Sequence, residues 1–152
     1  MSMSSARKSG LLVSEIRPIE KRHGAKKLPL FIARVQAGFP SPGDDYIEKN
    51  LDLNELLIKN PAATFFVKVE GDSMVNARIE SGDTLIVDRA IEVKDGNIVI
   101  ALINGELTVK RISIRNQRIF LHPENKSFKK IEITEEMDFD TWGVVTYIIH
   151  QA

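Results

Sequence analysis

Short runs of apolar residues, separated by turn signals, fill the chain from Thr64 onward. Their β-branched and aromatic content predicts β-strands. The predicted strands are Phe65–Val69, Thr84–Asp88, Asn97–Asn104, Glu106–Ile112, Ile119–His122, Ile131–Thr134 and Gly143–Ile149. Asn104-Gly105 lies between two of these runs and favours a type I′ hairpin turn, because both residues tolerate a positive φ. The spacing excludes a helical bundle and predicts a mostly β domain with an irregular, folded or barrel-like antiparallel sheet.

One short helix is predicted ahead of these strands. Asp52 is a suitable N-cap residue, and Glu55 three residues later completes a capping-box pattern. The helix is expected to run through Ile58 and to end before Pro61, with a short strand over Tyr46–Leu51 just before it. Its buried side chains are expected to be Leu53, Leu56 and Leu57.

The N-terminal part has a different pattern. Residues 1–27 show neither strand alternation nor a helical period and are rich in Ser, Lys and Arg, so we predict that they are largely disordered. Leu28–Val35 is more apolar and is expected to lie on the rest of the chain as an extended or short helical segment. Residues 36–45 contain Pro, Gly and Asp and predict a loop.

Charge is distributed unevenly, although 21 basic and 21 acidic residues balance overall. Residues 1–36 hold eight basic and two acidic residues, a balance of +6, so the remainder carries −6. This basic arm is either a solvated tail or a segment that docks on the acidic body or an anionic partner until it is removed. No apolar stretch is long enough to cross a membrane or to act as a secretory signal, which favours the cytoplasm.

The chain has no cysteine, which excludes disulfides, a thiol nucleophile and a thiolate metal site. It also has no Gly-rich phosphate loop, and we expect no cofactor and no metal.

Candidate chemistry begins at Gly71-Asp72-Ser73-Met74, directly after an apolar strand. A strand that ends in glycine is expected to present Ser73 at the lip of the sheet, where a substrate can reach its hydroxyl. A serine needs a base, and His23, His122 and His150 have no convincing acidic partner in the sequence. We therefore interpret these histidines as surface residues and consider a neutral lysine as the base.

Lys110 is the candidate for that base. Alternation along Glu106–Ile112 places Thr108 and Lys110 on one face of a strand, so the Thr108 hydroxyl is in a position to orient the amine. To act near neutral pH the lysine must lower its pKa from about 10.4 towards about 7, which costs about 4–5 kcal/mol and requires a dry site. The alternative is an ordinary lysine on an exposed strand face.

Six stretches carry a resemblance to a known family. They are Gln36–Pro42, Asp52–Ile58, Gly71–Met74, Gly82–Asp88, Glu106–Arg111 and Trp142–Val145. In this order, and over more than three quarters of the chain, they resemble the UmuD branch of the LexA/UmuD self-cleaving serine peptidases, which use a Ser-Lys dyad.

The resemblance implies residue roles. Ser73 would be the nucleophile and Lys110 the general base, with Ala37-Gly38 as the scissile bond. The backbone N–H groups of Asp72 and Ser73 would form the oxyanion hole. The expected domains are a flexible basic arm over residues 1–37, which self-cleavage removes, and a Ser-Lys peptidase-type β domain over residues 38–152.

The resemblance also implies partners. A RecA filament on single-stranded DNA would activate cleavage, as part of the SOS response to DNA damage. The processed homodimer would then serve a UmuC-like, error-prone Y-family polymerase in translesion synthesis. No sequence-specific DNA binding and no membrane partner are expected.

Three alternatives stay open at this level. The first is a regulatory binding module of the same fold that does not cleave. The second is a signal-peptidase-like enzyme, which the missing membrane anchor disfavours. The third is a LexA-like repressor fragment, disfavoured because residues 1–36 are too few and too irregular for a helix-turn-helix domain.

Overall fold

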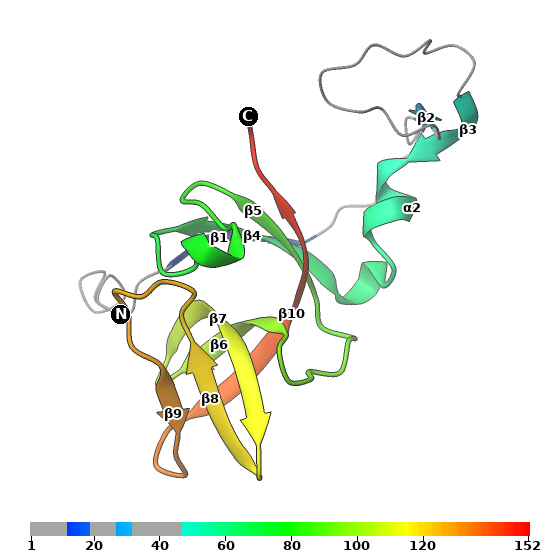
Figure 1. Ribbon diagram of the computed structural model, residues 1–152. Coiled ribbons are helices and arrows are strands. Elements are labelled where there is room, and N and C mark those ends of the chain that lie inside the picture. Colours follow the sequence, from blue (N-terminus) through cyan, green and yellow to red (C-terminus); the bar gives the residue numbers. More distant parts are fainter. Residues whose placement is uncertain (1–11, 19–26, 32–46) are drawn as a thin grey trace. The chain divides into compact units, whose positions relative to one another are not determined.

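The computed structural model describes residues 12–18, 27–31 and 47–152 (Figure 1). The chain divides into two compact units, which are considered separately. The sheet unit comprises residues 1–19 and 60–152, and the hairpin unit comprises residues 20–59. The predicted scissile bond, Ala37-Gly38, lies outside the described residues.

One antiparallel sheet makes up most of the sheet unit. Its strands are β1 (Leu12–Pro18), β4 (Thr64–Glu70), β5 (Thr84–Asp88), β6 (Ile98–Ile103), β7 (Glu106–Arg115), β8 (Arg118–His122), β9 (Ile131–Ile133) and β10 (Phe139–Ile149). They are hydrogen-bonded in the order β1-β4-β5-β10-β6-β7-β8-β9, with one further pairing between Leu12 of β1 and Thr108 of β7. Two short 3₁₀ turns, η2 (Pro61–Ala63) and η3 (Val75–Ala77), flank β4. The prediction of a mostly β, folded antiparallel sheet is confirmed.

Two tight hairpins set the register around β7. Asn104 and Gly105 have φ values of 48° and 84°, as the predicted type I′ turn between β6 and β7 requires. Asn116 and Gln117 also have positive φ, at 49° and 64°, and join β7 to β8. The sequence did not predict this second turn, and β7 consequently runs to Arg115, beyond the predicted end.

A bulge explains why β10 begins earlier than predicted. The register against β6 shifts between Thr141 and Gly143, so β10 starts at Phe139 and continues through the irregularity. Gly143 has φ +141°, and a Cβ there would lie 2.7 Å from Val87 Cγ1. Only glycine permits β5 and β10 to approach so closely at this point.

β1 is a strand that the sequence did not predict. It pairs antiparallel with β4 from Leu12 to Pro18, and its register shifts between Val13 and Glu15. That shift hides the regular alternation that identifies a strand in sequence. Val13 is half-buried and packs against the core of the sheet unit. For β1, therefore, the prediction of disorder over residues 1–27 is wrong.

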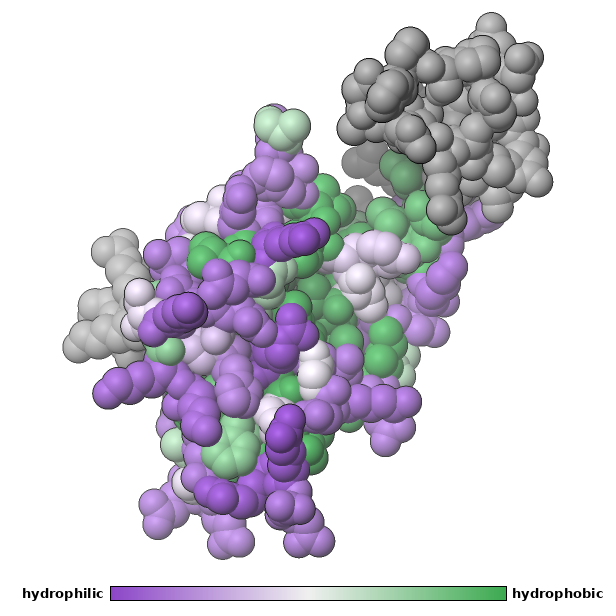
Figure 2. Space-filling model, in the orientation of Figure 1, coloured by the Kyte–Doolittle hydropathy of each residue, from purple (hydrophilic) through white to green (hydrophobic). Residues whose placement is uncertain are grey.

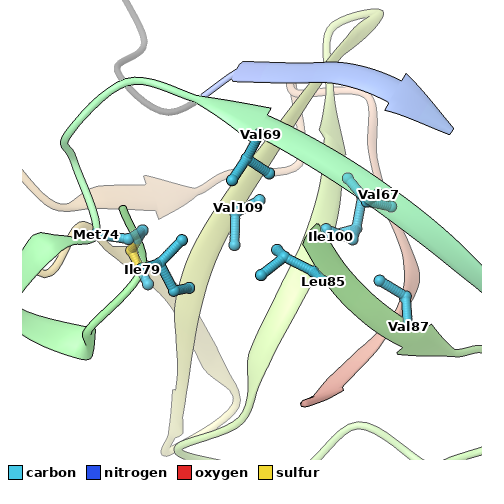
Figure 3. Packing of buried hydrophobic residues seen from close by; sticks show 8 residues of the cluster. All are labelled: Val67, Val69, Met74, Ile79, Leu85, Val87, Ile100 and Val109. Atoms are coloured by element: carbon cyan, nitrogen blue, oxygen red, sulfur yellow. The ribbon is translucent and has the colours of Figure 1, made fainter. Parts of the chain in front are cut away.

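Among the residues that the structure describes, buried apolar side chains of the sheet unit gather in two clusters. The first cluster contains Val67, Val69, Met74, Ile79, Leu85, Val87, Ile100 and Val109 (Figure 3). The second cluster contains Val99, Ala101, Ile112, Leu121 and Val144. Val99 and Ala101 belong to one cluster and Ile100, between them, to the other, because successive side chains of a strand point to opposite faces. β6 is therefore covered on both sides.

The hairpin unit contains β2 (Lys27–Phe31), β3 (Ile47–Asp52) and α2 (Leu53–Leu57). β2 and β3 form an antiparallel pair, which confirms the predicted strand before the helix. Asp52 is the N-cap as predicted, because its side chain accepts a hydrogen bond from Asn54 N–H at 2.9 Å.

The predicted burial of this helix is wrong. Leu53 and Leu56 are 48% and 42% exposed, and Leu57 is only half-buried. Because α2 has five residues and its C-cap, Ile58, is extended, the helix lacks the length to present an apolar stripe to a core. Three residues separate the end of α2 at Leu57 from Pro61, the first residue of η2, so proline is not the residue that stops the helix.

Polar and charged residues cover much of the visible face of the sheet unit, with apolar residues gathered between them (Figure 2). Its exposed large apolar side chains are Val75, Ile91, Ile114, Tyr147 and Ile149. Across residues 12–18, 27–31 and 47–152, no helix has the length and apolar content to cross a membrane.

Candidate active site

Ser73 lies in the turn that connects β4 to η3. Gly71, with φ +108°, ends the strand, and its N–H donates a hydrogen bond to Ser81 Oγ at 3.2 Å. Ser73 and Met74 are both 0% exposed. The prediction of a serine at an exposed lip is therefore wrong: in this structure the turn is folded inward, and its methionine is part of the first core cluster.

The loop that follows β8 holds this turn at three points. Asn125 Nδ2 donates to the Asp72 carbonyl at 2.8 Å. Asn76 N–H donates to the Glu124 carbonyl at 2.8 Å, and Glu124 N–H lies 3.3 Å from Met74 Sδ. Because these contacts lie on both sides of Ser73, the loop fixes the backbone that carries the serine.

Lys110 lies in the middle of β7 and is only 2% exposed. Its Nζ donates to Thr108 Oγ1 at 2.6 Å and to the Val109 carbonyl at 3.2 Å. Thr108 and Lys110 thus share a face, in agreement with strand alternation. Burial lowers the pKa of Lys110 from 10.5 to about 8, because the charged ammonium loses its solvation.

The hydrophobic core connects the turn that carries Ser73 with β7, the strand that carries Lys110. Met74, which follows Ser73, and Val109, which precedes Lys110, belong to the same core cluster (Figure 3). The fold therefore brings together two segments that lie far apart in the sequence. A direct contact between Ser73 and Lys110 stays a prediction, as do the roles of Ala37 and Gly38.

Arg111, next to Lys110, makes contacts that the sequence did not suggest. Its Nε forms an ion pair and hydrogen bond with Glu124 Oε1, and its Nη1 donates to the Gly96 carbonyl at 2.6 Å. Glu124 is in the loop that holds the serine turn, so this pair connects that loop to β7. The sequence did not suggest this contact, because contacts across such separations leave no local pattern.

The histidines have different surroundings. His23 lies outside the described residues, and the half-buried His122 packs its ring 6.3 Å from that of Phe120. His150 does have acidic partners: its Nδ1 lies 2.7 Å from Asp83 Oδ1, and its Nε2 lies 3.4 Å from Glu80 Oε2. The expectation of no such partner is wrong for His150, because the pairing of β10 with β5 brings together residues 67 positions apart.

The carboxylates next to His150 raise its pKa above 6.5, chiefly through the hydrogen bond to Asp83 and then through the charge of Glu80. Within residues 12–18, 27–31 and 47–152, no group of three or more His, Cys, Asp or Glu side chains could hold a metal ion.

Comparison with known proteins identifies the family. A family model described as Peptidase S24-like matches residues 29–146. The chain is 49% identical to protein ImpA of Salmonella typhimurium over 124 residues, which cover 82% of this chain and 84% of ImpA. It is 42% identical to protein MucA of Escherichia coli over 121 residues, which cover 79% of this chain and 82% of MucA.

A more distant relative is the LexA repressor of Colwellia psychrerythraea, 35% identical over 138 residues, which cover 90% of this chain and 64% of the repressor. The chain belongs to the peptidase S24-like family, a family of serine peptidases. Within that family it is a UmuD-like member of the LexA/UmuD group.

Proposed function

We propose that the protein cleaves its own chain between Ala37 and Gly38, with Ser73 as nucleophile and Lys110 as general base. The observation that carries this proposal is the burial of Lys110, which lowers its pKa to about 8. At that pKa a useful fraction of the amine is neutral near physiological pH and able to take a proton from a serine. Membership of a serine peptidase family supports the assignment.

The chemistry follows from these roles. Lys110 Nζ accepts the proton of Ser73 Oγ as the oxygen attacks the Ala37 carbonyl carbon. The N–H groups of Asp72 and Ser73 stabilise the negative charge that forms on the carbonyl oxygen. Lys110 then returns the proton to the amine of Gly38, and water releases Ala37 from the serine. Thr108 acts as a supporting residue, since its hydroxyl accepts a hydrogen bond from Lys110 Nζ.

Cleavage would occur in the cytoplasm during the SOS response, when a RecA filament on single-stranded DNA favours the cleavable arrangement. The product, residues 38–152, would form a homodimer that acts as an accessory subunit of a UmuC-like Y-family polymerase during translesion synthesis. Similarity to ImpA and MucA over about four fifths of the chain supports this placement in SOS mutagenesis.

The direct test is intact-mass analysis of the purified full chain. The protein is incubated with RecA, single-stranded DNA and a nucleoside triphosphate, or alone at alkaline pH. A fragment that begins at Gly38 is expected from the wild type, and none from Ser73→Ala or Lys110→Ala. If the wild type stays whole in both conditions, the chain is a non-cleaving binding module of the same fold. If the alanine variants cut as fast as the wild type, the proposed dyad is wrong.

Gly38→Glu provides a control that changes the proposed cleavage site instead of the dyad. A bulky charge next to the scissile carbonyl is expected to block cleavage and to leave the thermal unfolding midpoint nearly unchanged. A large loss of thermal stability would instead assign the segment around Gly38 a structural role.

A further inference from the structure

Asn125 makes a contact that bears on the chemistry of Ser73. Its Nδ2 donates to the Asp72 carbonyl at 2.8 Å, although the two residues are 53 positions apart. The same carbonyl accepts a second hydrogen bond, from Val75 N–H at 3.3 Å. The oxygen of the peptide group between Asp72 and Ser73 is thus held from two directions.

The Asn125 side chain is itself held in this orientation. Its Oδ1 accepts a hydrogen bond from Ser127 N–H at 2.9 Å, and its own carbonyl accepts one from Phe128 N–H at 3.1 Å. Because Ser127 N–H is a donor and the Asp72 carbonyl is an acceptor, only one placement of the amide nitrogen satisfies both contacts. Asn125 is therefore a fixed donor.

Planarity of the peptide unit transmits this restraint to Ser73. The peptide bond between Asp72 and Ser73 is trans, so its C=O and N–H point in opposite directions. A hydrogen bond that fixes the Asp72 oxygen therefore also fixes the direction of the Ser73 N–H. Oxyanion donors are effective only when they already point at the position where negative charge develops.

We infer that Asn125 is a positioning residue that orients the Ser73 N–H for the oxyanion hole. The inference rests on the proposed self-cleavage, in which that N–H is one of two oxyanion donors. Asn125 acts through the backbone, by its hydrogen bond to the Asp72 carbonyl. The contacts of Glu124 with Asn76 and Met74 hold the rest of the turn, whereas Asn125 supplies the shorter of the two hydrogen bonds to the Asp72 carbonyl.

The test compares two substitutions at position 125 with a matched control. Asn125→Ala removes the amide, whereas Asn125→Asp keeps an oxygen for Ser127 N–H but places an oxygen opposite the Asp72 carbonyl. Thr146→Val is the control, because it also removes one hydrogen bond from a side chain to a backbone carbonyl, that of Ile86 at 3.2 Å. The first-order rate of self-cleavage is measured across pH together with the thermal unfolding midpoint.

Both Asn125 variants are expected to cleave about ten- to hundredfold more slowly than the wild type at every pH. The pH midpoint of the rate is expected to stay unchanged, because the Asn125 side chain bonds to the Asp72 carbonyl and to Ser127 N–H, and neither group titrates. Thr146→Val is expected to keep the wild-type rate. Wild-type rates in the Asn125 variants, a shifted midpoint, or an equal loss in Thr146→Val would each overturn the inference.

A second measurement does not depend on cleavage. The backbone ¹⁵N order parameter of Ser73 in the intact chain is expected to fall in both Asn125 variants and to be unchanged in Thr146→Val. An unchanged Ser73 amide would overturn the positioning role even if the rate fell. A wild type that does not cleave would refute the proposed function, while this measurement would still decide whether Asn125 holds the peptide group.

Discussion

Lys110 and His150 belong to the same sheet unit, yet their proton affinities are shifted in opposite directions. Lys110 is 2% exposed, and its Nζ donates to a hydroxyl and a backbone carbonyl. Its pKa falls to about 8 because burial removes the solvation of the charge. His150 is exposed and contacts two carboxylates, so its pKa rises instead.

The difference shows that environment decides which form of a basic side chain the fold favours. Loss of solvation in a buried strand favours the neutral amine, which is the form that a general base requires. Carboxylates at a surface favour a charged imidazolium, which suits an ion pair between the end of β10 and the Glu80–Asp83 turn.

The largest effect is expected from Lys110→Met, which replaces the amine with an unbranched apolar chain of similar length. Self-cleavage should fall at least about a thousandfold, because the serine loses its base. The free energy of unfolding at pH 7 should rise by about 1–3 kcal/mol, because a lysine held at a pKa near 8 is charged at that pH and costs desolvation energy. Urea unfolding measures the gain.

The size of this gain depends on pH. The folded pKa of Lys110 lies below the unfolded value of 10.5, so between about pH 8 and pH 10.5 the unfolded chain binds more protons and wild-type stability rises with pH. The stability difference from Lys110→Met should therefore shrink across this window. Lys68→Met, at an exposed strand position, is the control, and its effect on the free energy of unfolding should be smaller than that of Lys110→Met. A destabilised Lys110→Met at pH 7 would contradict this account.

A smaller effect is expected in the pH dependence of self-cleavage without an activator. With a pKa of about 8, roughly a tenth of Lys110 is neutral at pH 7 and roughly nine tenths at pH 9. The rate should rise about tenfold over this range, with a midpoint near pH 8. Intact-mass time courses measure it. A midpoint near 10.5 would mean that the reacting lysine is solvated.

The smallest effect, on thermal stability, is expected from the exposed His150 and its two carboxylate partners. A raised pKa of His150 stabilises the fold below its ordinary value of 6.5, and this contribution is lost as the pH rises through the raised value. His150→Gln should lower the thermal midpoint at pH 6 by a few degrees at most, with a smaller difference near pH 8. Differential scanning calorimetry provides the measurement.

Glu80→Gln is the matched control for His150. It removes the more distant carboxylate and keeps the hydrogen bond to Asp83, so the midpoint should shift less than in His150→Gln. A thermal midpoint that is independent of His150 at both pH values would show that the pair contributes nothing to stability.

Local patterns predicted much of the sheet. The features that they predicted wrongly or not at all have physical causes. The positive φ preferences of Asn104 and Gly105 identified their hairpin, because that preference depends on the two residues themselves. β1 was missed because its register shift breaks the alternation. The burial of Leu53 and Leu56 was overestimated, because an apolar period shows which face would be buried but not whether the helix is long enough to reach a core.

The candidate site also has some features that local patterns predicted and others that they did not. Alternation along β7 predicted that Thr108 and Lys110 share a face, and the hydrogen bond between them agrees. The burial of Ser73 was not predicted, since it depends on a turn whose backbone contacts a loop some 50 residues later. Nor did the sequence predict the contact of Asp83 with His150, which results from the pairing of β5 with β10.

The sequence by itself predicted most of the strands, though not β1, and the hairpin at Asn104-Gly105. It also identified Ser73 and Lys110 as candidates for the chemistry, because periodicity and residue type are local properties. Only the tertiary structure decided that Lys110 is buried deeply enough for its pKa to fall. It also decided that Asn125 holds the peptide group before Ser73 and that His150 faces two carboxylates. Solvation and long-range hydrogen bonds depend on which strands pair, and pairing joins residues that no local pattern connects.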